Sequence, residues 1–156
     1  ISACLVGSEM CIRDSYITSR IDVNNKCFLA PENMTEAIKS YCNNNDLIIP
    51  DTAGEIAAVV YKSLADSYAD TVMQIEKNLD ITYDAIYVIG GGANAGYLNQ
   101  LTADSTGKTV VAGPAEATAI GNIMAQMIAD SVFKNLKEAR ACVRDSFDIK
   151  RFEQKR

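Results

Sequence analysis

The stretch Ile86-Tyr87-Val88-Ile89-Gly90-Gly91-Gly92-Ala93-Asn94 decides the fold that this sequence predicts. An apolar run breaks into three adjacent glycines, and the residues that follow have the pattern of a helix. Glycine adds no packing and costs backbone entropy, so three in a row indicate a need for bare backbone. The usual need is the close approach of a phosphate or a nucleotide ring to main-chain N–H groups where a helix begins. The alternative is a tight strand-to-helix turn that binds no ligand.

The segments around this stretch continue the alternation of strands and helices. Residues 85–89 and 109–112 are apolar on both faces, as in strands buried in a parallel sheet. Between them a helix carries Leu98 and Leu101 on one face and ends at Gly107, which suits the residue after a helix. Because the connections are short, the order predicts an α/β fold with parallel strands joined by right-handed crossover helices.

Two further helices are expected after the second strand. Gly113-Pro114 is predicted to begin the first of them, with Pro114 in the first turn and Glu116 placed favourably against the helix dipole. The second is capped by Asn135 and runs through Val143. The first of these helices carries a ridge of small residues that we expect to pack closely on the sheet or on a neighbouring helix: Ala117, Gly121 and Ala125.

The earlier half of the chain is predicted to be helical. Asn33 caps a helix that ends near Cys42, and Thr52 with Glu55 forms a capping box at the start of a long helix. The long helix carries a stripe of apolar residues at helical spacing, which predicts core packing. This stripe consists of Ile56, Val60, Leu64, Tyr68, Val72, Ile75 and Leu79.

Composition excludes several classes of function. A net charge of −5 argues against a nucleic-acid surface, and no apolar run approaches the length of a membrane span. The five cysteines are odd in number and scattered, which favours free thiols in the cytoplasm over a disulfide framework or a zinc site. The chain has no histidine, so catalysis by a His-based triad is excluded. We identify no catalytic residue and no metal ligand in this chain.

The first residues differ from the rest of the chain. Residues 1–15 have no clean periodicity and contain two of the five cysteines, so we interpret them as a non-native or unrelated leader. The alternative is an ordinary strand over residues 3–6. The domain is then expected over residues 16–156, and the chain is expected to begin in the middle of a protein.

Two familiar nucleotide motifs fit the glycine turn poorly. Gly90, Gly92 and Ala95 match a dinucleotide fingerprint, but that motif needs an acidic residue at the end of the next strand, roughly 20 residues on. Ala112 stands there instead. No Walker A motif exists, because Gly96 is not followed by lysine and a hydroxyl residue. A glycine turn flanked by two helix starts, without a lysine cradle, is typical of actin-like (ribonuclease H-like) ATPases.

Longer runs carry a specific resemblance. Residues 90–104 (Gly-Gly-Gly-Ala-Asn-Ala-Gly-Tyr-Leu-Asn-Gln-Leu-Thr-Ala-Asp), residues 110–118 and Gly121-Asn122 are similar to the C-terminal signature of the FGGY carbohydrate kinases. The combination of Leu98-Asn99-Gln100-Leu101 with Ala112-Gly113-Pro114 resembles the branch of that family that acts on L-rhamnulose. Residues 28–34, 63–68 and 136–152 resemble the same branch, so the resemblance covers nearly everything from about residue 21 onward.

The resemblance implies a two-domain kinase with ATP in the cleft between its domains. Such an enzyme transfers the γ-phosphoryl group of ATP, with Mg²⁺, to O1 of L-rhamnulose. Its aspartate base and its sugar-binding residues belong to earlier segments that this chain does not contain. The chain is thus expected to form part of an actin-like ATPase domain, and to be inactive alone. The residues implied in ATP binding are Gly90, Gly91, Gly92 and Asn94, with Gly91 matching the family glycine whose backbone approaches the nucleotide.

Several alternatives stay open at this point. The protein could be another sugar kinase of the same family, such as one acting on xylulose, or a nucleotide-binding module without catalysis. Asn94 is either a nucleotide contact or the N-cap of the following helix. Asp104 and Glu116 form a weak candidate for a carboxylate pair, since carboxylates at helix ends are commonly capping or solvated. Lys108 is a weak candidate for a phosphate contact.

Overall fold

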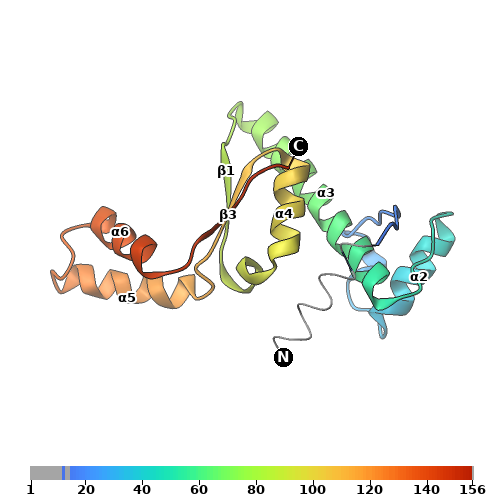
Figure 1. Ribbon diagram of the computed structural model, residues 1–156, viewed down its shortest axis with the longest axis horizontal. Coiled ribbons are helices and arrows are strands. Elements are labelled where there is room, and N and C mark those ends of the chain that lie inside the picture. Colours follow the sequence, from blue (N-terminus) through green and yellow to red (C-terminus); the bar gives the residue numbers. More distant parts are fainter. Residues whose placement is uncertain (1–11, 13–14, 156) are drawn as a thin grey trace. The chain divides into compact units, whose positions relative to one another are not determined.

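The computed structural model describes residue 12 and residues 15–155, which form two compact units. The first unit ends at Ile81 and the second begins at Thr82. Figure 1 shows the helices and strands of both units, coloured along the sequence. The leader expected over residues 1–15 lies for the most part outside the described residues and stays a prediction. From Ser15 onward the chain is tied down, because the amino group of Lys62 donates to the carbonyls of Ser15 (3.3 Å) and Ile17 (3.0 Å).

The first unit contains η1 (Lys26–Phe28), α2 (Met34–Asn44) and α3 (Ala53–Leu79). Both predicted helix starts are confirmed. The side chain of Asn33 accepts a hydrogen bond from the N–H of Glu36, and Thr52 and Glu55 form a complete capping box. α2 runs two residues beyond the expected Cys42, and the left-handed residue that follows it is Asp46.

The buried face of α3 differs from the predicted stripe. Its fully buried residues are Ala58, Val59, Ser63 and Ala65, whereas Tyr68 is 41% exposed and Leu79 is 54% exposed. A polar contact lies on the buried face: Ser63 accepts a hydrogen bond from the N–H of Ile21 (2.9 Å) and donates to the carbonyl of Val59 (2.6 Å). This brings the chain around Ile21 onto a face of small residues, which a search for large apolar side chains does not detect.

The second unit is built on a small mixed sheet. Strands β1 (Ala85–Val88) and β2 (Thr109–Ala112) are parallel, as predicted, and Ala85 pairs with Thr109. A third strand, β3 (Lys150–Phe152), was not expected and pairs antiparallel with β2. The sheet order is β1-β2-β3, which places β2 in the centre. The prediction of burial on both faces is therefore correct for β2 but wrong for β1, whose Tyr87 is 74% exposed.

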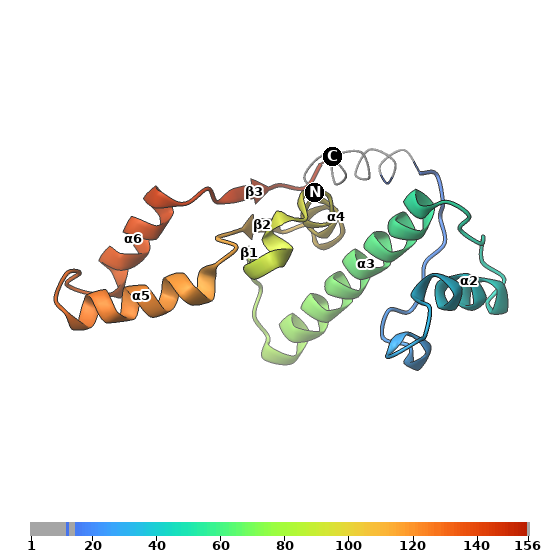
Figure 2. The same cartoon turned by 90° about the horizontal axis from the view of Figure 1, so that it is seen from below.

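Helices and a short 3₁₀ turn connect these strands. The turn η2 (Gly90–Asn94) follows β1, and α4 (Gly96–Thr106) leads back to β2. α4 packs against β2, and Figure 2 shows the two as neighbours. Gly107 follows the last residue of α4, and its φ of 68° is left-handed, as predicted for that position. Among the described residues, no helix is long and apolar enough to cross a membrane.

The last two helices are α5 (Ala117–Ala129) and α6 (Leu136–Ser146), which pack against each other (Figure 2). α5 begins later than expected: Pro114 precedes the helix and Glu116 is its N-cap residue. The cap of α6 at Asn135 is confirmed. The close packing expected for the ridge of small residues is wrong, because Gly121 is exposed and an added Cβ there would meet no described atom within 4 Å.

Candidate functional site

Two loops lie together where the parallel strands end. The glycine turn η2 follows the carboxyl end of β1, and residues 113–116 follow the carboxyl end of β2. The N–H of Gly113 donates to the carbonyl of Val88 (2.9 Å), and the N–H of Gly90 donates to the carbonyl of Pro114 (3.4 Å). Open α/β sheets bind their ligands at this edge, outside the carboxyl ends of the strands. The fold therefore places the predicted site residues where such sheets carry their sites.

The three glycines of the turn differ in what the backbone requires. Gly90 has a φ of 78°, a left-handed conformation that favours glycine. Neither Gly91 nor Gly92 has a positive φ, and an added Cβ at Gly92 would make only an ordinary contact with Val88, at 3.5 Å. Gly91 is exposed, and an added Cβ there would meet nothing within 4 Å. The described structure thus explains a glycine at position 90 but not one at position 91.

The neighbouring loop contains a glycine with a structural role. Gly113 has a φ of 116°, and an added Cβ would lie 3.1 Å from the carbonyl oxygen of Asp148. A side chain at Gly113 would push the chain leading into β3 away from the end of β2. This glycine keeps the loop close to the sheet and needs no ligand to explain it.

Asn94 does not cap the helix that follows the turn. It is the last residue of η2, and the N-cap residue of α4 is Ala95, which makes no side-chain capping bond. The capping role considered for Asn94 is therefore wrong. Its side chain is exposed at the same turn as Gly91, and its role in nucleotide contact stays a prediction.

Asn99 of α4, which the sequence did not indicate as a site residue, binds the glycine turn through its side chain. This side chain is only 3% exposed. Its amide nitrogen donates to the carbonyls of Gly92 (3.2 Å) and Ala93 (3.2 Å). One feature of the sequence could have indicated this role. An asparagine on the apolar side of a helix has low helix propensity, and its buried amide needs hydrogen-bond partners.

The weak candidates for charged site residues have structural partners. A carboxylate oxygen of Asp104 accepts hydrogen bonds from the side chain of Gln100 (3.0 Å) and the N–H of Lys155 (2.8 Å), so it fastens the segment after β3 to α4. Glu116 lies on the other loop, before α5. Lys108 donates to the carbonyl of Tyr83 (2.8 Å), which accounts for its ammonium group without a phosphate.

The part of the chain that the structure describes contains no set of side chains that could bind a metal ion. No three acidic or cysteine side chains there are grouped closely enough to hold an ion. Three side chains of the first unit, Cys42, Lys62 and Glu55, have shifted pKa values. Burial raises the pKa of the Cys42 thiol, and it lowers the pKa of Lys62 together with the charge of Arg20. Hydrogen bonds from the N–H groups of Thr52 and Asp51 lower the pKa of Glu55.

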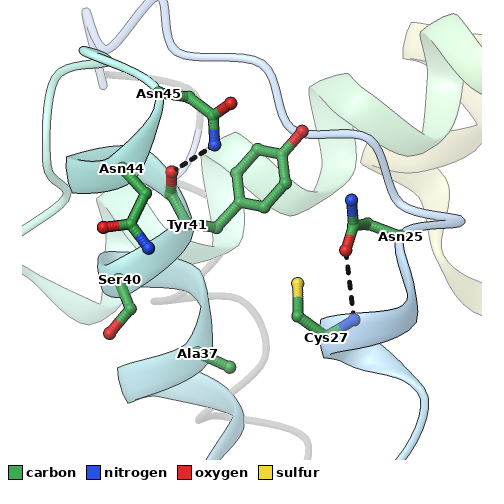
Figure 3. A pocket seen from close by; sticks show the side chains of 7 residues that line it. All are labelled: Asn25, Cys27, Ala37, Ser40, Tyr41, Asn44 and Asn45. Atoms are coloured by element: carbon green, nitrogen blue, oxygen red, sulfur yellow. Dashed lines mark hydrogen bonds between the residues drawn. The ribbon is translucent and has the colours of Figure 1, made fainter.

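A cavity of about 350 Å³ lies in the first unit, away from the glycine turn along the sequence. Asn25 and Cys27 line one side of it, and residues of α2 line the other (Figure 3). Two of the amides drawn there make local bonds: Asn25 accepts from the N–H of Cys27 (3.1 Å), and Asn45 donates to the carbonyl of Tyr41 (2.8 Å). These bonds shape the loop, and they give no indication of a ligand.

Comparison with known proteins gives consistent matches. A family described as the FGGY family of carbohydrate kinases, C-terminal domain, matches residues 21–129. A rhamnulokinase of Bacillus subtilis is 49% identical over 135 residues, which cover 86% of this chain and 28% of that protein. A rhamnulokinase of Oceanobacillus iheyensis is 48% identical over 131 residues, covering 84% and 28%. One of Halalkalibacterium halodurans is 46% identical over 134 residues, covering 86% and 29%.

The alignments cover most of this chain but only a small part of each relative. Nearly all of this chain aligns with the relatives, but it spans only 28% or 29% of their length. The family match begins at Ile21 and ends at Ala129, so it includes the glycine turn, the loop after β2 and α5.

Proposed function

The chain belongs to the FGGY family of carbohydrate kinases, and on this premise we propose that it supplies the nucleotide-facing turn of a kinase for L-rhamnulose. The full-length protein transfers the γ-phosphoryl group of ATP to O1 of that sugar. The proposal for the sugar rests on the names of the relatives, which are rhamnulokinases at 46–49% identity.

One observation carries the role of the turn. Gly91 is exposed, has no positive φ, and has open space where a side chain would stand. Neither backbone strain nor packing in the described structure accounts for a glycine there. A ligand that lies directly on the main chain does account for it, because any Cβ would stand in its way. Gly90 and Gly92 flank this contact, and Asn94 stands exposed at the end of the same turn.

This role fits the chemistry of phosphoryl transfer. Such enzymes act mainly by positioning the nucleotide and by stabilising charge, so a bare backbone turn is a useful part of the machinery. ATP binds here through main-chain groups and the shape of the turn. Mg²⁺ accompanies the phosphates of ATP in kinases, but no residue of the described chain is assigned to it, since no acidic cluster is present there. The general base and the sugar ligands are assigned to segments outside this chain.

A cytoplasmic location belongs to the same proposal. The three described cysteines, Cys27, Cys42 and Cys142, form no disulfide, which suits a reducing compartment. The partners proposed are ATP and the sugar. The net charge of −5 argues against nucleic acid as a partner.

The experiment compares Gly91→Ala and Gly91→Val in the full-length protein. The KM for ATP should rise with the size of the side chain, by roughly tenfold to a hundredfold for valine, since small displacements of a bound substrate are costly. The KM for L-rhamnulose and the thermal melt should stay at wild-type values. Unchanged ATP kinetics in a folded Gly91→Val protein would reduce the turn to a structural connection.

Sugar specificity is tested separately. The full-length protein should phosphorylate L-rhamnulose in preference to xylulose, with ATP as the donor. Preference for xylulose would keep the family assignment and overturn the sugar. Binding of ATP without transfer to either sugar would favour the non-catalytic module.

A further inference from the structure

The most specific contact at the glycine turn comes from a buried side chain of the helix that follows it. Asn99 lies in α4, is 3% exposed, and donates both of its described amide bonds to the carbonyls of Gly92 and Ala93. Both partners are acceptors, so the nitrogen of the amide must face them and the oxygen cannot. The geometry therefore fixes the orientation of the amide without ambiguity.

These two bonds hold one end of the turn. The side chain of Asn99 donates to two carbonyls near the end of η2: that of Gly92, which also accepts the N–H of Ala95 (3.1 Å), and that of Ala93. Because each peptide unit is planar, a fixed carbonyl also fixes the plane of its peptide. Ala93, only 7% exposed, anchors the same end by burial.

The other end of the turn is held less firmly. The N–H of Gly90 reaches the carbonyl of Pro114 at 3.4 Å, which is long for a hydrogen bond. Gly91 has no side chain, and apart from the adjoining backbone no described atom lies within 4 Å of its Cβ position. Its place relative to a ligand must therefore be set through the backbone, from the anchored end.

We propose that Asn99 is a positioning residue for nucleotide binding, acting through the carbonyls of Gly92 and Ala93 to fix the place of Gly91. It does not touch the nucleotide. This inference rests on the proposed function, in which Gly91 lies against ATP.

The test uses Asn99→Asp and Asn99→Ala in the full-length protein. Asn99→Asp keeps the shape of the side chain but places a carboxylate oxygen opposite the two carbonyls. Asn99→Ala removes the donors without adding charge. If the buried carboxylate of Asn99→Asp prevents folding, Asn99→Ala alone provides the test. The KM for ATP should rise about fivefold to tenfold, as expected when two hydrogen bonds to the turn are lost and the carbonyl of the buried residue Ala93 loses this donor. The KM for L-rhamnulose and the kcat at saturating ATP should stay within about twofold.

Thr102→Ala is the matched control. Thr102 lies on the same helix, is also 3% exposed, and its hydroxyl bond to the carbonyl of Leu98 stays within α4. It should lower the thermal melt without changing the KM for ATP. Hydrogen exchange of the amides of residues 90–94, measured in the full-length protein, should become faster in Asn99→Ala and stay unchanged in Thr102→Ala.

The positioning role is supported only if both the KM for ATP and the hydrogen exchange of residues 90–94 change in Asn99→Ala and not in Thr102→Ala. Equal rises in the KM for ATP for Asn99→Ala and Thr102→Ala would show a loss of stability alone, and a wild-type value in either readout for Asn99→Ala would overturn the positioning role. Gly91→Val in the same assay separates this result from the proposed function. If Gly91→Val raises the KM for ATP while the Asn99 variants do not, only the role of Asn99 fails. If Gly91→Val has no effect, the proposed site itself fails.

Discussion

The three glycines of the turn, Gly90, Gly91 and Gly92, differ in whether their backbone conformation requires a glycine. Gly90 is required by its φ of 78°, whereas Gly91 and Gly92 take conformations open to other residues. The sequence shows only that bare backbone is concentrated here. The dihedral angles give a conformational reason for glycine at position 90 and none at position 91.

This difference predicts opposite behaviour on replacement by alanine. Gly90→Ala should lower the free energy of unfolding by about 1–2 kcal/mol, the cost of a left-handed conformation for a residue with a Cβ. Gly91→Ala should leave it within about 0.5 kcal/mol, as for other exposed sites. Urea unfolding of the two variants, followed by circular dichroism, measures both. Equal losses would mean that the turn constrains Gly91 as strongly as Gly90.

At the scale of elements, local signals were predicted well and long-range ones were not. The caps at Asn33, Thr52 and Asn135 were found because a cap depends on residues three positions apart. The burial of Ser63 on α3 was not predicted, because its hydrogen-bond partner Ile21 lies 42 positions away in the sequence. Strand β3 was missed for a similar reason: a stretch beginning Lys150-Arg151 becomes a strand only by pairing with β2. The role of Asn99 was not predicted because its partners are backbone carbonyls, which every residue has and which therefore leave no pattern in the sequence.

The capping box of α3 predicts a pH dependence. Hydrogen bonds from the N–H groups of Thr52 and Asp51 to the Glu55 carboxylate lower the pKa of Glu55. A lowered pKa in the folded state means that the carboxylate stabilises the fold above its unfolded pKa, and that this contribution is lost as the pH falls through the folded pKa. The melting temperature of the wild type should therefore fall more steeply with acid than that of Glu55→Gln, whose amide oxygen can still accept both bonds without titrating.

The comparison needs only thermal melts of the two proteins between neutral pH and about pH 3, below the usual range of a glutamate pKa. Other carboxylates titrate in both proteins, so their effects cancel in the difference. Parallel curves would show that the capping bonds do not distinguish the charged from the neutral form of Glu55.

At the scale of the whole molecule, the short length of this chain relative to its relatives determines the activity that we expect of it. The chain spans 28% or 29% of three relatives, and its match to the family begins only at Ile21. The fold class predicted from the glycine stretch, part of an actin-like ATPase domain with parallel strands, is confirmed by the family match together with the pairing of β1 and β2. No residue of this chain is proposed as the general base.

We therefore predict no phosphorylation of L-rhamnulose by this chain alone, even at high ATP. The full-length protein should be active in the same assay. Sugar-dependent release of ADP, with the full-length protein as the positive control, measures this. Turnover by the isolated chain would show that a catalytic base lies among its own carboxylates.

The position of β1 at the rim of the sheet has a practical consequence for handling the chain. Among the described strands, β1 pairs only with β2, and Tyr87 and Ile89 are 74% and 62% exposed. Residues 85–89 are apolar, carry no charge and contain no proline, which is the profile of a segment that recruits further copies into aggregates. Expressed alone, the chain should grow into larger particles as its concentration rises, and a Tyr87→Lys gatekeeper should keep it dispersed in light-scattering measurements.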